Sequence, residues 1–246
     1  MTYLMTSPTP LAAEEDIGDQ IGHHITATIG GLTFNVDTIW STVFAAGVVI
    51  GLGLLLRRRI TSGVPSRLQL VFENVVEQVR EQVHAQIGPT APFVVPLAIA
   101  LFMFILIANW LEIVPTDHRL PPPSADVNLT FALALVVIVW MHIVSFRRKG
   151  AKGYFKHFAQ PYPVLVPINI IEEIAKPITL ALRLFGNIFS GSIMIILIGL
   201  FPALLVPWPN AAWKLFDMFI GVIQAFIFAL LTILYFAGAV ETEESH

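Results

Sequence analysis

The sequence predicts an all-α, polytopic membrane protein with about five transmembrane helices, the last two forming a long, strongly tilted hairpin, plus an amphipathic interfacial helix. Hydrophobic residues make up 56% of the 246 residues and charged residues only 13%, whereas about a quarter of the residues in soluble domains are charged. The mean hydropathy is +0.76. The apolar residues also form several runs of about 20 residues, the length that crosses a ~30 Å hydrocarbon core.

The first half of the chain offers three spans and one interfacial helix. We expect spans at residues 36–56, 93–114 and 129–146, with a proline-rich loop at 115–128. Residues 66–87 place apolar residues at helical spacing opposite a charged side. This segment is therefore expected to lie at the membrane surface rather than to cross it.

The C-terminal third is too long for ordinary spans. Residues 164–206 are almost continuously apolar, and even 35 residues of α-helix would measure roughly 52 Å. Such a helix must tilt steeply or bend, and Pro167 and Pro177 offer bending points. Residues 213–240 then return after a turn marked by three prolines, Pro202, Pro207 and Pro209.

The distribution of basic residues predicts the orientation, because Lys and Arg near span ends are retained on the cytoplasmic side. Five basic residues follow the first span and five follow the third, whereas the loop after the second span holds only Arg119. Residues 1–35 are thus expected to form an extracytoplasmic N-terminal segment, and the C-terminal tail to be cytoplasmic. We expect residues 36–246 to form one domain in the plasma membrane.

The composition argues against several classes of function. The net charge of −3 leaves no basic excess, so no nucleic-acid partner is expected. The chain has no cysteine and only 7 histidines, so we expect no thiol chemistry, no metal site and no cofactor. His23 and His24 lie in the polar N-terminal segment and are expected to be solvated. That segment does not have the pattern of a cleavable signal peptide.

Each helix of the long hairpin carries a polar stripe. On the first helix, six residues at intervals of three or four share one face: Glu172, Lys176, Thr179, Arg183, Asn187 and Ser190. The stripe on the second helix consists of Lys214, Asp217, Gly221, Gln224, Phe228 and Thr232. Polar residues at membrane depth typically line an ion pathway or face a partner, because lipid leaves them unsatisfied.

Arg183 is the most informative member of these stripes. A cation in the middle of a span costs about 2.5 to 3.5 kcal/mol unless it finds water or a counter-charge. Taken alone it is compatible with a snorkelling or ion-paired arginine, but the stripe as a whole favours a pathway. Glu172 and Glu173 precede it by about three turns, and Asp217 is expected nearer the outer face. A fixed cation at low dielectric repels H₃O⁺, so protons are expected to approach it from either side without crossing.

Four motifs resemble subunit a of the bacterial F-type ATP synthase. They are RLFGN at 183–187, NIIEE at 169–173 followed by Lys176-Pro177, QAFIF at 224–228, and PSADVN at 123–128. The similarity runs from about Val64 to the C-terminus. The N-terminal 35 residues carry none of these motifs.

The resemblance implies a non-catalytic stator subunit that serves ATP synthesis by passing protons to and from a rotating c-subunit ring through two offset half-channels. Arg183 matches the family's essential arginine, which ionises the ring carboxylate and blocks leakage. Asn187 and Gln224 match flanking polar positions, and Gln224 is expected to face Arg183 across the hairpin. Glu172 or Glu173 matches the acidic position of the cytoplasmic half-channel, and helical spacing favours Glu172.

The resemblance also implies partners and an ion. The partners are the c-ring, the b subunits of the peripheral stalk and the lipid bilayer, and the exposed side of residues 66–87 is the expected docking surface for the stalk. A proton rather than Na⁺ is favoured by family prevalence.

One departure from the family concerns the outer half-channel. Some relatives carry an interacting Glu and His there, and by register those positions are Ser192 and Asp217 in this chain. We therefore hypothesise that Asp217 is the outer proton relay, with Asp126 and His142 as further contributors. For His142, a hydrogen-bonded interhelical role is the favoured alternative.

Two other classes of membrane protein fit less well. A secondary transporter or stand-alone channel typically has inverted repeats and paired broken helices, which the sequence does not reveal. An intramembrane protease is disfavoured because HExxH and GxSxG do not occur, and Gly191-Ser192 lacks both a second glycine and an obvious histidine base.

Overall fold

The computed structural model confirms the predicted fold class. It describes residues 26–29, 32–60, 66–88, 92–113, 121–158, 162–202 and 204–240. Within these residues, four helices are long and apolar enough to cross a membrane, and a fifth apolar helix is shorter. The chain is thus a multi-pass membrane protein. His23, His24 and Arg119 lie outside the described residues, as does the C-terminal tail.

A small β-hairpin precedes the first long helix and was not predicted. Strands β1 (Thr26–Ile29) and β2 (Leu32–Asn35) pair antiparallel, with Thr26 opposite Asn35 and Ile29 opposite Leu32. The strands are rich in β-branched and aromatic residues, which suit a sheet. Helix α2 (Val36–Arg59) follows directly and covers the predicted first span.

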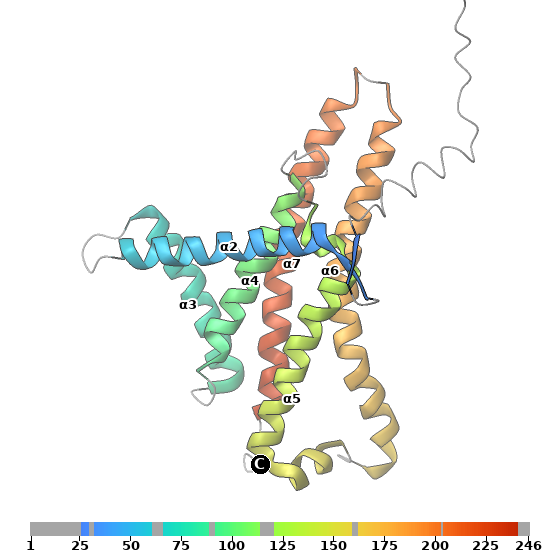
Figure 1. Ribbon diagram of the computed structural model, residues 1–246. Coiled ribbons are helices and arrows are strands. Elements are labelled where there is room, and N and C mark those ends of the chain that lie inside the picture. The colour runs from blue at the N-terminus through green and yellow to red at the C-terminus, as the bar shows by residue number, and fades with distance from the viewer. Residues whose placement is uncertain are drawn as a thin grey trace, which may run out of the picture.

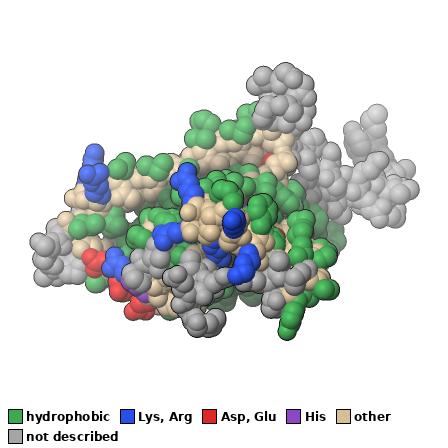
Figure 2. Space-filling view, turned by 90° about the horizontal axis from the view of Figure 1, so that it is seen from below, with side chains coloured by type: hydrophobic (Ala, Val, Ile, Leu, Met, Phe, Trp, Pro, Cys, Tyr) green, Lys and Arg blue, Asp and Glu red, His purple; other side chains and the backbone are tan. Residues whose placement is uncertain are grey.

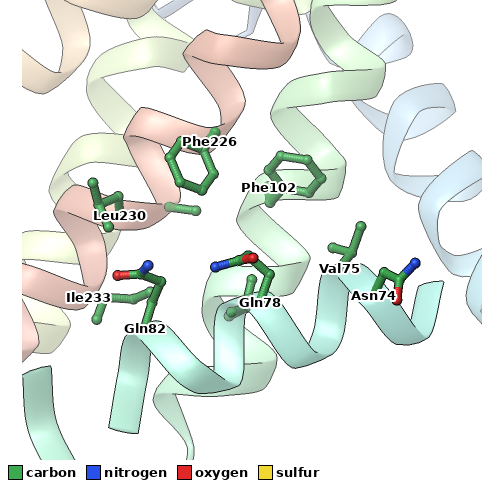
Figure 3. Close-up of a pocket in the computed structure, with 10 residues that line it drawn as sticks. Asn74, Val75, Gln78, Gln82, Phe102, Phe226, Leu230 and Ile233 are labelled. Atoms are coloured by element: carbon green, nitrogen blue, oxygen red, sulfur yellow. The ribbon is translucent and has the colours of Figure 1, made fainter. Parts of the chain in front are cut away.

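Helix α3 (Arg67–Ile87) is amphipathic as predicted. The Ser66 side chain caps it by accepting a hydrogen bond of 3.3 Å from the Gln69 backbone N–H. Val79 and Val83 are buried, and the helix packs against α4 and α7. A hollow of about 210 Å³ remains there, with Phe102 and Phe226 on one side and amide side chains of α3 on the other (Figure 3).

Helices α4 and α5 differ in length from the second and third predicted spans. Helix α4 (Val94–Trp110) is continued by the short 3₁₀ turn η2 (Leu111–Ile113). After a second 3₁₀ turn, η3 (Pro123–Ala125), helix α5 (Val127–Phe158) runs well past the expected end at residue 146. The basic residues end the apolar run but are good helix formers, so the helix continues beyond them.

Helix α5 bends sharply at Gly150, whose φ is 68°. A positive φ is easily adopted by glycine, which has no Cβ atom to clash with the backbone. We call the part of α5 after Arg147, including this bend, the elbow (residues 148–158).

The last two helices form the predicted long hairpin. Helix α6 (Val166–Gly199), preceded by the 3₁₀ turn η4 (Pro163–Leu165), and helix α7 (Pro207–Val240) have 34 residues each, or about 51 Å at 1.5 Å per residue. Helix α7 begins six residues before the predicted start at 213, because proline is well tolerated in the first turn of a helix. Helix α6 continues through Pro177.

The arrangement of the helices supports a strongly inclined hairpin. Helix α2 runs across α6 and α7 rather than alongside them (Figure 1). If α2 crosses the bilayer steeply, the two hairpin helices must therefore lie at a shallow angle to the membrane plane. Helix α5 lies between the separated lower halves of α6 and α7, and α4 packs on the other side of α7 (Figure 1).

The core lies where α4, α5, α6 and α7 meet. Its largest fully buried side chains include Ile105, Leu184, Phe228 and Phe236. Helices α4 and α7 approach closely at Gly221, since a Cβ atom there would lie 3.2 Å from the Cβ atom of Asn109. A small residue at this position therefore sets the spacing of the two helices.

Candidate functional site

The polar stripe of α6 faces outward from the chain. Glu172, Thr179, Arg183 and Ser190 are all exposed, whereas the helix buries Leu180 and Leu184 and other apolar residues on its opposite side. Among the residues that the structure describes, no carboxylate forms an ion pair with the Arg183 guanidinium. An uncompensated cation thus stands on the surface of an apolar helix.

The polar stripe of α7 faces inward instead. Gly221, Gln224, Phe228 and Thr232 are buried, and Gln224 is only 6% exposed. The Nε2 atom of Gln224 is buried and has no hydrogen-bond partner within the described part of the chain. The same holds for the Nδ2 atom of Asn187 on α6.

Arg183 and Gln224 lie at the same level of the hairpin. Arg183 precedes Gly199, the last residue of α6, by 16 residues, and Gln224 follows Pro207, the first residue of α7, by 17. No hydrogen bond joins the two side chains in the described ranges. Both nevertheless offer unused hydrogen-bonding groups at one depth, together with Asn187.

Toward the N-terminal end of α6, four side chains form a connected polar cluster, which we call the Glu173 cluster: Tyr154, His142, Glu173 and Lys176. The Tyr154 hydroxyl lies 3.1 Å from His142 Nδ1, and His142 Nε2 lies 3.5 Å from Glu173 Oε1. Lys176 Nζ donates to Glu173 Oε2 at 2.5 Å. This cluster joins α5 to α6.

The two adjacent glutamates have different surroundings. The Glu173 side chain is 19% exposed and lies between His142 and Lys176, whereas that of Glu172 is 67% exposed and lies 4.0 Å from Lys176. Glu172 shares the outward face of Arg183, as the spacing predicted. His142 lies beside Glu173, about 27 Å along α6 from the region of Asp217. Its contacts are those of the interhelical alternative, which the sequence favoured over a part in the outer relay.

Asp217 has a carboxyl neighbour that sequence reasoning missed. A Cβ atom on Gly191 of α6 would lie 3.3 Å from Asp217 Oδ1 and 3.3 Å from Glu112 Oε1. Three elements therefore meet at this point: η2, α6 and α7. Both oxygens of the Glu112 side chain are buried. If that side chain is ionised, neither oxygen accepts a hydrogen bond from any residue that the structure describes. The available signal was a carboxylate inside the predicted span 93–114.

Asp126 and Ser192 form structural hydrogen bonds, which for Asp126 reach the start of α2 and for Ser192 stay within α6. Asp126, only 5% exposed, accepts hydrogen bonds from Asn35 Nδ2 at 2.7 Å and from the Thr38 hydroxyl at 2.8 Å. It also accepts one from the backbone N–H of Asn128 at 2.8 Å and so caps α5. The Ser192 hydroxyl donates to the Ile188 carbonyl at 3.0 Å. Asp126 thus connects the start of α2 to the start of α5.

A further polar contact lies between the Glu112–Asp217 pair and Asp126. The Ser124 hydroxyl donates to Asn109 Oδ1 at 3.1 Å, and Asn109 Nδ2 donates to the Gly221 carbonyl at 3.4 Å. Both side chains are buried. The PSADVN motif is thereby connected to α4 and, through it, to the polar stripe of α7.

Comparisons with known proteins show the family of the chain. Residues 39–237 match the family model described as ATP synthase A chain. The chain is 53% identical over 242 residues to ATP synthase subunit a of Acidothermus cellulolyticus, covering 97% of this chain and 88% of that protein. It is 50% identical over 239 residues to ATP synthase subunit a of Mycobacterium marinum, covering 92% and 96%. The subunit from Coxiella burnetii is 36% identical over 239 residues, covering 89% and 90%. The chain therefore belongs to the ATP synthase subunit a family.

Proposed function

We propose that this chain is the proton-translocating stator subunit of the membrane sector of a rotary F-type ATP synthase. In this role Arg183 separates two offset half-channels that load and unload the carboxylates of a c-subunit ring. The observation that carries the proposal is the exposed Arg183 side chain, which has no carboxylate partner among the described residues and lies on an apolar helix. A charge in that position is stabilised by water or by a counter-charge from another chain.

The counter-charge that fits best is a carboxylate on a moving partner. A carboxyl group crosses lipid at low cost only when it is neutral. The guanidinium favours the ionised form, so the group loses its proton on reaching Arg183 and regains one beyond it. A rigid bidentate ion pair would stall the partner. The exposed position of Arg183 instead allows a brief, hydrated approach.

Each side of Arg183 has its own protonatable groups. Glu172 lies 11 residues before it on the same helical face, and we assign it to the cytoplasmic half-channel. The Glu112–Asp217 pair lies on the opposite side and is assigned to the outer half-channel. A proton taken up through this pair reaches the ring carboxyl group, and its release on the cytoplasmic side passes Glu172.

The remaining features of the proposal concern placement. The basic residues that follow α2, with those at the end of α5, favour a plasma-membrane orientation with an outer N-terminus and a cytoplasmic C-terminus. The exposed charged side of α3 is the surface that we assign to the b subunits of the peripheral stalk. Residues 1–35 and 36–246 remain our proposed division of the chain.

The test is substitution of Arg183 in the assembled complex. We expect Arg183→Ala to abolish ATP synthesis and to permit a passive proton leak. Arg183→Lys should also fail, because lysine sheds its charge at low dielectric more readily than arginine. Arg57→Ala, at an exposed position near the end of α2, is the matched control and should retain synthesis. Near-normal coupled synthesis in either Arg183 variant would overturn the proposal, as would proton conduction by the purified chain alone.

A further inference from the structure

A hollow of about 340 Å³ lies on the surface of α5 just before the elbow. Its walls are formed by Val139, His142, Ile143, Phe146, Arg147 and Tyr154. The bend at Gly150 creates it, because it returns Tyr154 toward the preceding helix. The Tyr154 ring then packs edge-on against Phe146, with 5.8 Å between the ring centroids, and its hydroxyl meets His142.

The hollow has an apolar wall and a cationic end. Val139, Ile143 and Phe146 follow one another at helical spacing and are each about half exposed, at 52%, 47% and 47%. Arg147 comes next, is exposed, and forms no ion pair or hydrogen bond with any residue that the structure describes. One wall of the hollow is therefore apolar along most of its length and ends at the positive charge of Arg147.

The surroundings strengthen the positive charge. Arg148, Lys152 and Lys156 are exposed on the elbow, and residues 127–158 contain no acidic side chain. The acidic neighbour of His142 is Glu173 of α6, whose carboxylate is paired with Lys176. Lys and Arg side chains gather on this end of the molecule (Figure 2). Anionic phosphate is thus the complementary ligand, and charge of this kind at the end of a span attracts anionic lipid head groups.

The elbow is held in place before any ligand arrives. Lys149 Nζ donates to the Gly238 carbonyl of α7 at 2.9 Å, and Asn169 Nδ2 of α6 donates to the Phe158 carbonyl at 2.8 Å. A site whose walls are already ordered loses less conformational freedom on binding. The hollow therefore has both the chemistry and the rigidity of a binding site.

We propose that this hollow binds one anionic phospholipid, with its phosphate at Arg147 and an acyl chain along Val139, Ile143 and Phe146. The proposed site requires only that the chain lies in a lipid bilayer, and it does not depend on the proposal that the chain translocates protons. It differs from the hollow beside α3, where the polar groups are uncharged amides and no cation lies among the lining residues.

The experiment measures lipid retained by the purified complex that contains this chain. Complexes with wild-type chain, Arg147→Gln, Arg147→Lys or Arg57→Gln are equilibrated with phosphatidylglycerol and phosphatidylcholine, and bound lipids are counted by native mass spectrometry. Arg57, exposed at the end of α2, is the matched control. We expect Arg147→Gln to weaken phosphatidylglycerol retention by about fivefold, equivalent to ~1 kcal/mol for one cation. Arg147→Lys and Arg57→Gln should retain it.

A second variant tests the apolar wall. Ile143→Gln places an amide where the acyl chain is assigned and should also lower retention, with Arg147 unchanged. Three outcomes would overturn the site: equal loss in Arg57→Gln, which indicates diffuse attraction; no loss in Arg147→Gln; or equal retention of phosphatidylcholine. Failure of the proton-translocation proposal would leave these results unaffected, since lipid retention is measured without ATP turnover.

Discussion

Glu112 and Asp217 bring their carboxyl groups to one point of the structure, where an oxygen of each lies 3.3 Å from the position of a Cβ atom on Gly191. The two oxygens are thus no more than twice 3.3 Å, or 6.6 Å, apart. Two carboxylates this close at low dielectric resist simultaneous ionisation. The pair is therefore suited to hold one proton and pass it on.

The first prediction concerns this pair. We expect Asp217→Asn and Glu112→Gln each to lower ATP-driven proton pumping by about a hundredfold, the low end of the effect of losing a proton-transferring group. The double variant should be little worse than the poorer single variant, because residues that act as one unit are not additive. Pumping is measured in inverted vesicles. Wild-type pumping in Asp217→Asn would assign the outer relay to another group.

The second prediction concerns the glycine between the two acids. Gly191→Ala places a methyl group 3.3 Å from both carboxyl oxygens, so one of them must move away. We expect a loss of proton flux by a few-fold with normal assembly of the complex. Gly199→Ala, on the same helix with no atom within 4 Å of the added Cβ, is the control. Equal flux in the two variants would show that the spacing of the pair is unimportant.

The third prediction separates structure from transport at Asp126. Asp126→Ala removes the cap of α5 and the acceptor for Asn35 and Thr38. We expect the purified complex to unfold at lower temperature, since loss of an N-cap costs about 0.5 to 2 kcal/mol. Proton flux per assembled complex should be retained. Thr38→Val removes only one of these bonds and should have a smaller thermal effect. Loss of flux in stable Asp126→Ala complexes would instead support a relay.

The fourth prediction compares the adjacent glutamates. Glu173→Gln weakens the links to His142 and Lys176, so we expect it to loosen the contact between α5 and α6 and to lower thermal stability. Glu172→Gln leaves that cluster intact and should reduce ATP synthesis only mildly, because water substitutes for an exposed carboxylate. Both rates are compared after normalising for assembly. Complete loss of proton flux in Glu172→Gln would contradict the idea of a wide aqueous vestibule.

Helical periodicity predicted the parts of the site that lie on one helix. The spacing of Glu172, Arg183 and Ser190 sufficed to place them on one face of α6, and the structure agrees. Contacts between distant segments were inaccessible to this reasoning. Glu112 meets Asp217 only because η2 packs beside α6 and α7. The contact of His142 with Glu173 was inaccessible for the same reason, since periodicity does not tell which neighbour a helix face touches.

The ends of helices were hardest to predict where the apolar run and the helix end at different residues. The apolar run of α5 stops at Phe146, but the helix continues through the basic residues that follow because Arg and Lys favour helix, and it resumes after the bend at Gly150 as far as Phe158. The bend at Gly150 could not be read from the sequence, because an isolated glycine is compatible with a straight helix as well as with a positive φ. Composition alone thus missed the elbow.

Because the hairpin is strongly inclined, two points far apart along α6 differ more in their lateral position than in their depth in the bilayer. Glu173 and Gly191 are 18 residues apart on α6, about 27 Å of helix. If this helix stood upright, that length would nearly span the ~30 Å hydrocarbon core of the bilayer. Inclined as proposed, the helix would instead displace the two half-channels of the proposed function from each other along the membrane plane. In the proposed function, a ring carboxyl group that passes from one half-channel to the other would then advance along the membrane plane, as rotation of the ring requires.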